Sequence, residues 1–94
     1  MKLWRSSDTI SQVVGEELLL LEQQVGRLHH LNSTAAWIYA RCDGRTSESI
    51  AAELSQNYGV DPSVAAQDLD RLAKELAELG LIQLAELSPL TPSG

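Results

Sequence analysis

The chain has 94 residues, and its 13 acidic and 7 basic side chains give a formal net charge of −6 at pH 7. This length predicts one small domain of modest stability, and the negative charge disfavours the phosphate contacts that nucleic-acid binding requires. The single cysteine excludes a disulfide within the chain and is typical of a reducing compartment. No secretory signal or membrane-spanning run is evident, so we expect a cytoplasmic protein that contacts neither nucleic acid nor membrane.

The first third of the chain predicts three strands. β-branched residues favour a strand over residues 10–14, and runs of apolar residues bounded by turn residues favour two more, over 17–22 and 27–31. The four consecutive leucines 18–21 are also compatible with the start of a buried helix, but the close turn residues on both sides favour a strand. Short connections predict an antiparallel meander whose first and third strands lie at its edges.

The rest of the chain predicts three helices, over residues 33–42, 47–58 and 62–79. Each is preceded by a residue type that caps helix N-termini, namely Asn32, Thr46 and Asp61. The last helix carries a stripe of apolar residues at alternating spacings of four and three, and residues 81–82 are expected to pack back onto the core. The predicted fold is α+β, a three-stranded antiparallel sheet followed by three helices, resembling a winged helix-turn-helix. We expect one domain over 1–87 and a disordered tail over 88–94.

Three features suggest chemistry but are better explained by structure. Residues 62–79 contain two basic and four acidic side chains, which argues against a DNA-reading helix. His29 and His30 are neighbours on a strand and point to opposite faces, so they are poorly placed to bind one metal ion. Cys42 falls on the apolar face of the first helix, where a small buried residue is expected. We therefore predict no catalytic residues, no metal, no cofactor and no enzyme activity.

The third predicted strand, Arg27 to Leu31, lacks proline and carries little charge, so it has few of the features that protect an edge strand from pairing. It could pair with a second copy in a homodimeric scaffold, lie beneath the N-terminal segment, or accept an extended peptide as an added strand. A groove beside it could be lined by either flank of the third helix. One flank holds Ala66, Ala73 and Ala77, and the other holds Asp68, Arg71 and Glu75.

An ordered set of motifs resembles the PqqD family of peptide chaperones, which recognise the leader region of ribosomally made, modified peptides. The set consists of residues 20–36, Ile38, Cys42-Asp43-Gly44, residues 50–54, Tyr58-Gly59-Val60-Asp61 and Asp68-Leu69. The resemblance covers roughly residues 10–82, and it implies a winged-helix-like fold that binds a leader peptide as an extra antiparallel strand. It also implies a modifying enzyme as second partner, such as a radical-SAM protein or a leader peptidase. Many relatives carry aromatic residues where this chain has Leu28 and His29, so its pocket shape is expected to differ.

By position, the resemblance implies that the peptide pairs with the third strand and packs against the third helix. The implied peptide-binding residues are Arg27, Leu28, His29, His30, Leu31, Asp68, Leu69, Leu72, Ala73 and Leu76. Two other functions remain open from the residues alone: a winged-helix regulator that binds DNA or a protein, and a homodimer paired through the same edge.

Overall fold

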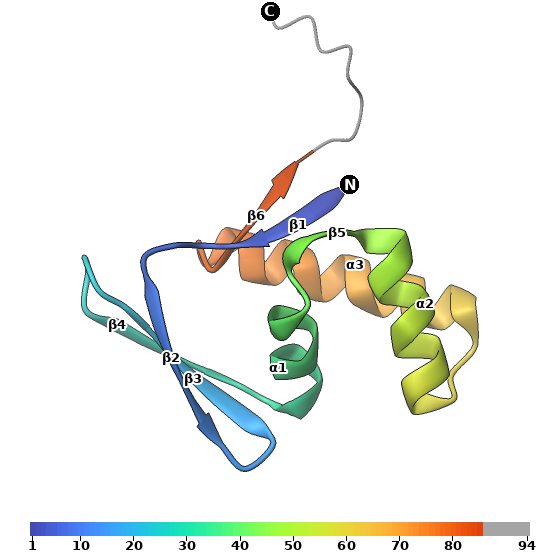
Figure 1. Cartoon of the computed structure of the whole chain (residues 1–94), viewed down its shortest axis with the longest axis horizontal. Helices are drawn as coiled ribbons and strands as arrows, with labels where there is room; N and C mark the ends of the chain where they lie inside the picture. Colours follow the sequence, from blue (N-terminus) through green and yellow to red (C-terminus); the bar gives the residue numbers. More distant parts are fainter. Residues whose placement is uncertain (86–94) are drawn as a thin grey trace, which may run out of the picture.

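The computed structural model describes residues 1–85. The expected disordered tail over 88–94 lies outside the described residues. The elements in chain order are β1 (Lys2–Arg5), β2 (Thr9–Val14), β3 (Glu17–Glu22), β4 (Arg27–Leu31), α1 (Ser33–Ala40), β5 (Asp43–Thr46), α2 (Ser47–Tyr58), α3 (Pro62–Glu78) and β6 (Ile82–Ala85). Two three-stranded antiparallel sheets and three helices confirm the α+β class (Figure 1).

The first sheet is the predicted meander, in the order β2–β3–β4. β3 pairs with β2 from Glu22 opposite Thr9 to Glu17 opposite Val14, and it pairs with β4 over the whole length of that strand. Hence β3 is central and the outer sides of β2 and β4 are the two edges, as the short connections predicted. Figure 1 shows this sheet at the left, with the helices to its right.

The three helices begin where the sequence predicted. The side chains of Asn32, Thr46 and Asp61 each accept a hydrogen bond from a backbone N–H in the first turn of the helix that follows. Because these N–H groups have no partner within the helix, the caps stabilise the helix starts. α2 ends at Gly59, whose φ of 66° is the left-handed conformation that glycine adopts readily.

The second sheet, in the order β5–β1–β6, was not predicted. β1 is its central strand and pairs with β5 on one side and with β6 on the other, both antiparallel. Segments from the start, the middle and the end of the described chain therefore meet in one sheet. Gly44 in β5 has a φ of 102°, and a Cβ there would lie 2.4 Å from the ring of Trp4, so only glycine fits.

The core lies between the sheets and the helices. One face of the first sheet contributes Leu18, Leu20 and Leu31, and the helices contribute residues that include Ile38 and Leu69. Leu81 and Ile82 are buried, as expected. Two large side chains at helix ends are exposed: Tyr58, the last residue of α2, is 45% exposed, and Leu79, which follows α3, is 42% exposed.

Candidate functional site

The free edge of β4 is the first component of the candidate site. Among the described residues, β4 pairs with β3 on one side and with no strand on the other. Leu31 and His29 lie on the face of the sheet that covers the core, because Leu31 and its partner Leu18 are buried. Leu28 and His30 alternate onto the outer face, and Leu28 is 63% exposed. The edge therefore offers backbone hydrogen-bonding groups along a whole strand.

The charged side chains of β4 are paired within the first sheet. The Nε2 atom of His29 lies 2.6 Å from Oε2 of Glu22, and Nε of Arg27 lies 3.8 Å from the same oxygen. On the outer face, Nε2 of His30 lies 2.5 Å from Oε1 of Glu17. The two histidines contact different glutamates on opposite faces, and only the His29 side chain is largely buried, at 9% exposure against 58%. This confirms the prediction that the two neighbouring histidines point to opposite faces of the sheet.

A cavity of about 380 Å³ begins at Asn32, the residue that follows β4. Its lining comes from the start of α1, the end of α2 and one side of α3, and comprises Asn32, Thr34, Leu54, Tyr58, Val60, Asp68, Arg71 and Leu72. We call it the β4 cavity. The apolar walls suit an apolar side chain of a bound peptide, and the carboxylate and guanidinium at one side suit a polar group close to it in the same peptide.

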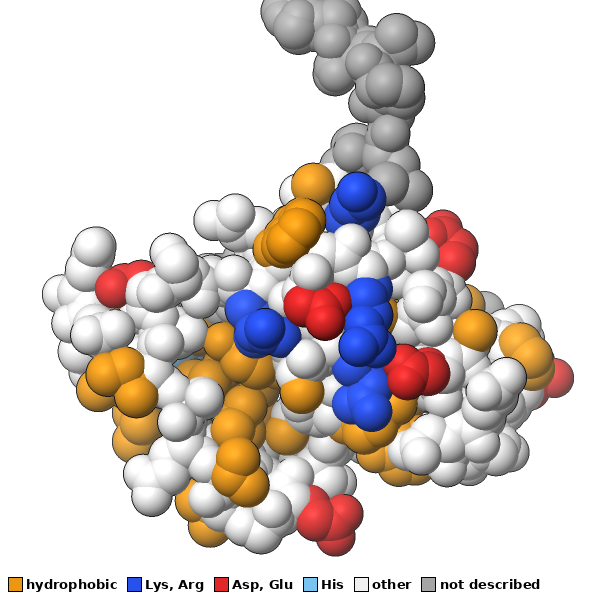
Figure 2. Space-filling model, in the orientation of Figure 1, with side chains coloured by type: hydrophobic (Ala, Val, Ile, Leu, Met, Phe, Trp, Pro, Cys, Tyr) orange, Lys and Arg blue, Asp and Glu red, His pale blue; other side chains and the backbone are white. Residues whose placement is uncertain are grey.

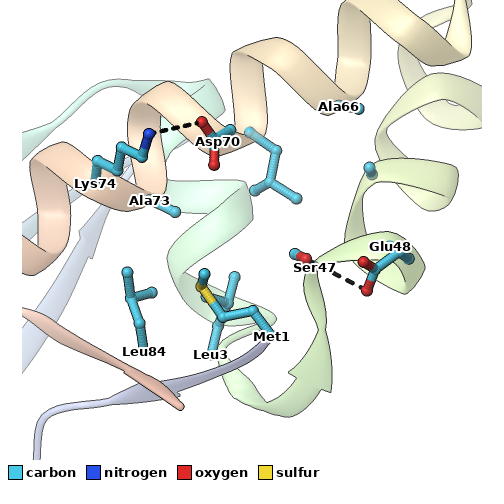
Figure 3. A pocket seen from close by; sticks show the side chains of 11 residues that line it. Met1, Leu3, Ser47, Glu48, Ala66, Asp70, Ala73, Lys74 and Leu84 are labelled. Carbon is cyan, nitrogen blue, oxygen red and sulfur yellow. Dashed lines mark hydrogen bonds and ion pairs between the residues drawn. The ribbon is translucent and has the colours of Figure 1, made fainter. Parts of the chain in front are cut away.

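The two flanks of α3 face different cavities. Asp68 and Arg71, which lie 3.4 Å apart as an ion pair, border the β4 cavity together with Leu72. The alanine flank faces a smaller cavity of about 150 Å³, where Ala66 and Ala73 lie opposite residues of β1, β6 and the start of α2. Figure 3 shows the Asp70–Lys74 ion pair on α3 at the rim of this second cavity, with Leu3 and Leu84 facing α3 from the second sheet.

The structure places only some of the proposed α3 residues in the same cavity as Asn32, the residue that follows β4. Asp68 and Leu72 line the β4 cavity. Leu69 and Ala73 are buried and line the second cavity instead, and Leu76 is buried in the core. All five strand residues, Arg27 to Leu31, form β4 as expected.

Sequence reasoning did not assign Tyr58, Val60 and Thr34 to the site. Tyr58 continues the spacing of Ile50 and Leu54 on α2, both of which are buried in the core. Its ring, however, packs edge-on against Trp37 of α1, with ring centres 5.9 Å apart, and borders the β4 cavity. A hydrogen bond of 2.6 Å from the Ser55 hydroxyl to the Val60 carbonyl holds the loop beside it. The available signal was position, because Tyr58 is the last residue of α2 and lies directly before Gly59, where the helix ends.

Cys42 has no features of a reactive thiol. It is fully buried, and its Sγ donates to the carbonyl oxygen of Ile38 at 3.3 Å. Burial raises the pKa of the Cys42 thiol to about 11, although the positive charge of Arg5 acts in the opposite direction. The thiol is therefore protonated at neutral pH, and its burial matches the expectation of a small buried residue at this position. Within residues 1–85, no three His, Cys, Asp or Glu side chains are grouped so that they could hold a metal ion.

Known proteins with the same fold add a finding about peptides. The chain matches the PqqD family, described as coenzyme PQQ synthesis protein D, over residues 17–82. Two solved structures are similar. One, described as TbiB1 in complex with the TbiA(beta) leader peptide, has a TM-score of 0.79 at 26% identity and covers 92% of this chain and 100% of its own. The other, a lasso peptide synthetase B1 complexed with the leader peptide, has a TM-score of 0.78 at 26% identity and covers 89% and 100%. No curated protein sequence matches the chain.

Within the described residues, no helix is long and apolar enough to cross a membrane.

Proposed function

This chain belongs to the PqqD family, and from that premise we propose that it binds the leader region of a ribosomally made precursor peptide and presents the precursor to a modifying enzyme. Both similar structures hold a leader peptide. The observation that carries the proposal is local: a free strand edge, β4, leads directly into a cavity that one side of α3 borders.

The backbone of β4 would supply most of the affinity. An extended peptide laid along Arg27 to Leu31 gains main-chain hydrogen bonds that do not depend on its sequence. A peptide that is disordered when free also loses conformational entropy on binding, which costs about 2–5 kcal/mol. Micromolar to sub-micromolar affinity is therefore a reasonable expectation for this edge.

Specificity would come from the β4 cavity. Side chains of an added strand alternate between the two faces of the sheet, so every second residue of the leader would point to the face where the helices lie. Tyr58 and Leu72 offer apolar contact there, while Asp68 and Arg71 offer one charge of each sign. A leader with an apolar side chain and a polar one two residues away suits this lining.

The chain itself would perform no chemistry. Its one thiol is buried and protonated, and its two histidines are paired with glutamates on opposite faces. The reaction on the precursor therefore belongs to a second protein, such as a radical-SAM enzyme or a leader peptidase. A precursor made on ribosomes is available in the cytoplasm, which is where we place the encounter.

Titration with a synthetic leader tests the proposal. The peptide is the leader of any short precursor found to be encoded in the gene neighbourhood, and backbone amide shifts of the labelled protein are followed. We expect the largest changes at residues 27–31 and around Asp68 and Leu72, with residues lining the second cavity, such as Ala66, as internal controls. Saturable shifts confined to another surface would show that the proposed site is wrong.

A further inference from the structure

The first sheet has a second free edge, β2, which the proposed function does not use. Among the described residues β2 pairs only with β3, through six residue pairs without a register shift. Five of its six residues are exposed, and three of these are apolar: Ile10 at 53%, Val13 at 72% and Val14 at 51%. Figure 2 shows hydrophobic side chains gathered over this sheet and beside it.

β2 also lacks the features by which proteins keep an edge strand from pairing. Its sequence, Thr-Ile-Ser-Gln-Val-Val, has no charge and no proline, and its regular register contains no bulge. Such an edge readily accepts another strand. A partner strand with matching properties, uncharged and rich in β-branched residues, is present on every other copy of the chain.

We propose that β2 is a self-association surface, on which a second copy of this chain pairs through its own β2 in antiparallel orientation to form a six-stranded sheet. Each chain has a net charge of −6, but β2 itself carries no charged side chain, so pairing of the two β2 strands brings no like charges together within the strands. Since a two-fold axis places the same patch on both copies, the strand must be complementary to itself.

The register follows from the alternation of side chains. A two-fold axis normal to the sheet keeps both outer faces on one side, so outer-face residues oppose outer-face residues. With Gln12 on the axis, Ile10 of each copy faces Val14 of the other, and the two Gln12 amides face each other. A shift by two residues would place Ser11 on the axis and oppose Ile10 to Gln12, pairing an apolar side chain with a polar one. The Gln12-centred register is therefore favoured.

This arrangement leaves both β4 edges free at the outer ends of the six-stranded sheet. Each copy in the dimer therefore keeps its own proposed leader site. The pairing through β2 uses a different edge, so this inference does not depend on the proposed function. The net charge of −6 on each chain opposes association. Added salt screens this charge, so we expect dimerisation to strengthen as ionic strength rises.

Charge substitution at Gln12 tests the pairing. Sedimentation of the full chain over a range of concentrations and salt should show a monomer–dimer equilibrium. Gln12→Lys and Gln12→Glu should each weaken it about fivefold, because like charges then face each other across the axis. An equimolar mixture of the two variants should recover dimers, detected as heterodimers by native mass spectrometry. Such rescue requires that residue 12 faces residue 12.

The matched control is His30→Lys, because His30 lies in the same row of the outer face but on the opposite edge, β4. It should leave dimerisation unchanged, and leader peptide should not dissociate the dimer. A chain that stays monomeric at every concentration and salt would overturn the inference. Dimers that are disrupted by the leader peptide or by His30→Lys would also overturn the inference, because such dimers pair through β4. Leader binding by Gln12→Lys is measured separately, so failure of the dimer leaves the proposed function intact.

Discussion

Proline substitution at each of the two histidines of β4 distinguishes the side of the strand that pairs with β3 from the side that is free to pair with a leader peptide. In an antiparallel strand the N–H and C=O groups of one residue point to the same side, and those of the next residue point to the opposite side. His29 and His30 are adjacent, so one of them donates its N–H toward β3 and the other directs its N–H to the free edge. His29→Pro and His30→Pro each remove one donor, but only one of the two removes a bond to the leader.

The size of the effect follows from the loss of one hydrogen bond. A peptide–peptide hydrogen bond contributes about 1–2 kcal/mol when its acceptor is left without a partner. For the variant that faces the free edge, this corresponds to about 5- to 30-fold weaker leader binding with the fold intact. In the other variant the bond to β3 is lost, so the free energy of unfolding falls by a similar amount.

Fluorescence anisotropy with a labelled leader peptide measures the affinity, and urea unfolding followed by circular dichroism measures the stability. His29→Ala and His30→Ala are the controls, because each removes the contact with Glu22 or Glu17 but keeps the backbone donor. Leader affinity that is unchanged in both proline variants, when both are folded, would refute strand addition at β4.

Three further predictions concern other parts of the molecule. Leu72→Ala should weaken leader binding by about 1–2 kcal/mol through lost apolar contact, whereas Leu84→Ala at the second cavity should not; equal effects would contradict the assignment of the β4 cavity. Thr46→Ala removes the oxygen that accepts from the N–H of Ser49 and should cost about 1 kcal/mol in urea unfolding, with leader affinity unchanged. The raised pKa of the Cys42 thiol, from 9.0 to about 11, predicts that stability falls as pH rises from 9 to 11, because the unfolded thiol ionises first. In Cys42→Ala this contribution should be absent.

Local patterns predicted the first sheet and the helices well. The strands over 17–22 and 27–31 and the helix over 47–58 have the predicted bounds. These elements depend on neighbouring residues: turn residues close the strands, and a side chain three positions away caps the helix.

The second sheet could not be predicted in the same way. β5 reads Asp-Gly-Arg-Thr, which is a turn by composition and becomes a strand only because β1 pairs with it. β1 and β6 are four residues each and lie near opposite ends of the described chain. Strand propensity depends on the neighbours a strand finds in the fold, and here all of those neighbours are distant in sequence.

For the candidate site, the sequence indicated the strand but left the helix face open. Flanking turn residues and short connections predicted that Arg27 to Leu31 is a strand at the edge of its sheet, and the structure places it there. Both flanks of α3 remained possible because periodicity gives the direction of a side chain around its own helix, without showing what lies opposite. Asn32 lines the same cavity as Asp68 and Leu72 only because of the tertiary structure. This contact shows that the charged flank of α3, and not the alanine flank, borders the β4 cavity.

The central place of β1 in the second sheet has a consequence for synthesis on the ribosome. β2, β3 and β4 are consecutive, so the first sheet needs only short loops to close and can form while later residues are still being added. β1 emerges first but finds β6 only when Leu84, the partner of Leu3, has been made. The second sheet therefore closes last, and a nascent chain carries the free edge of β4 before the domain is complete.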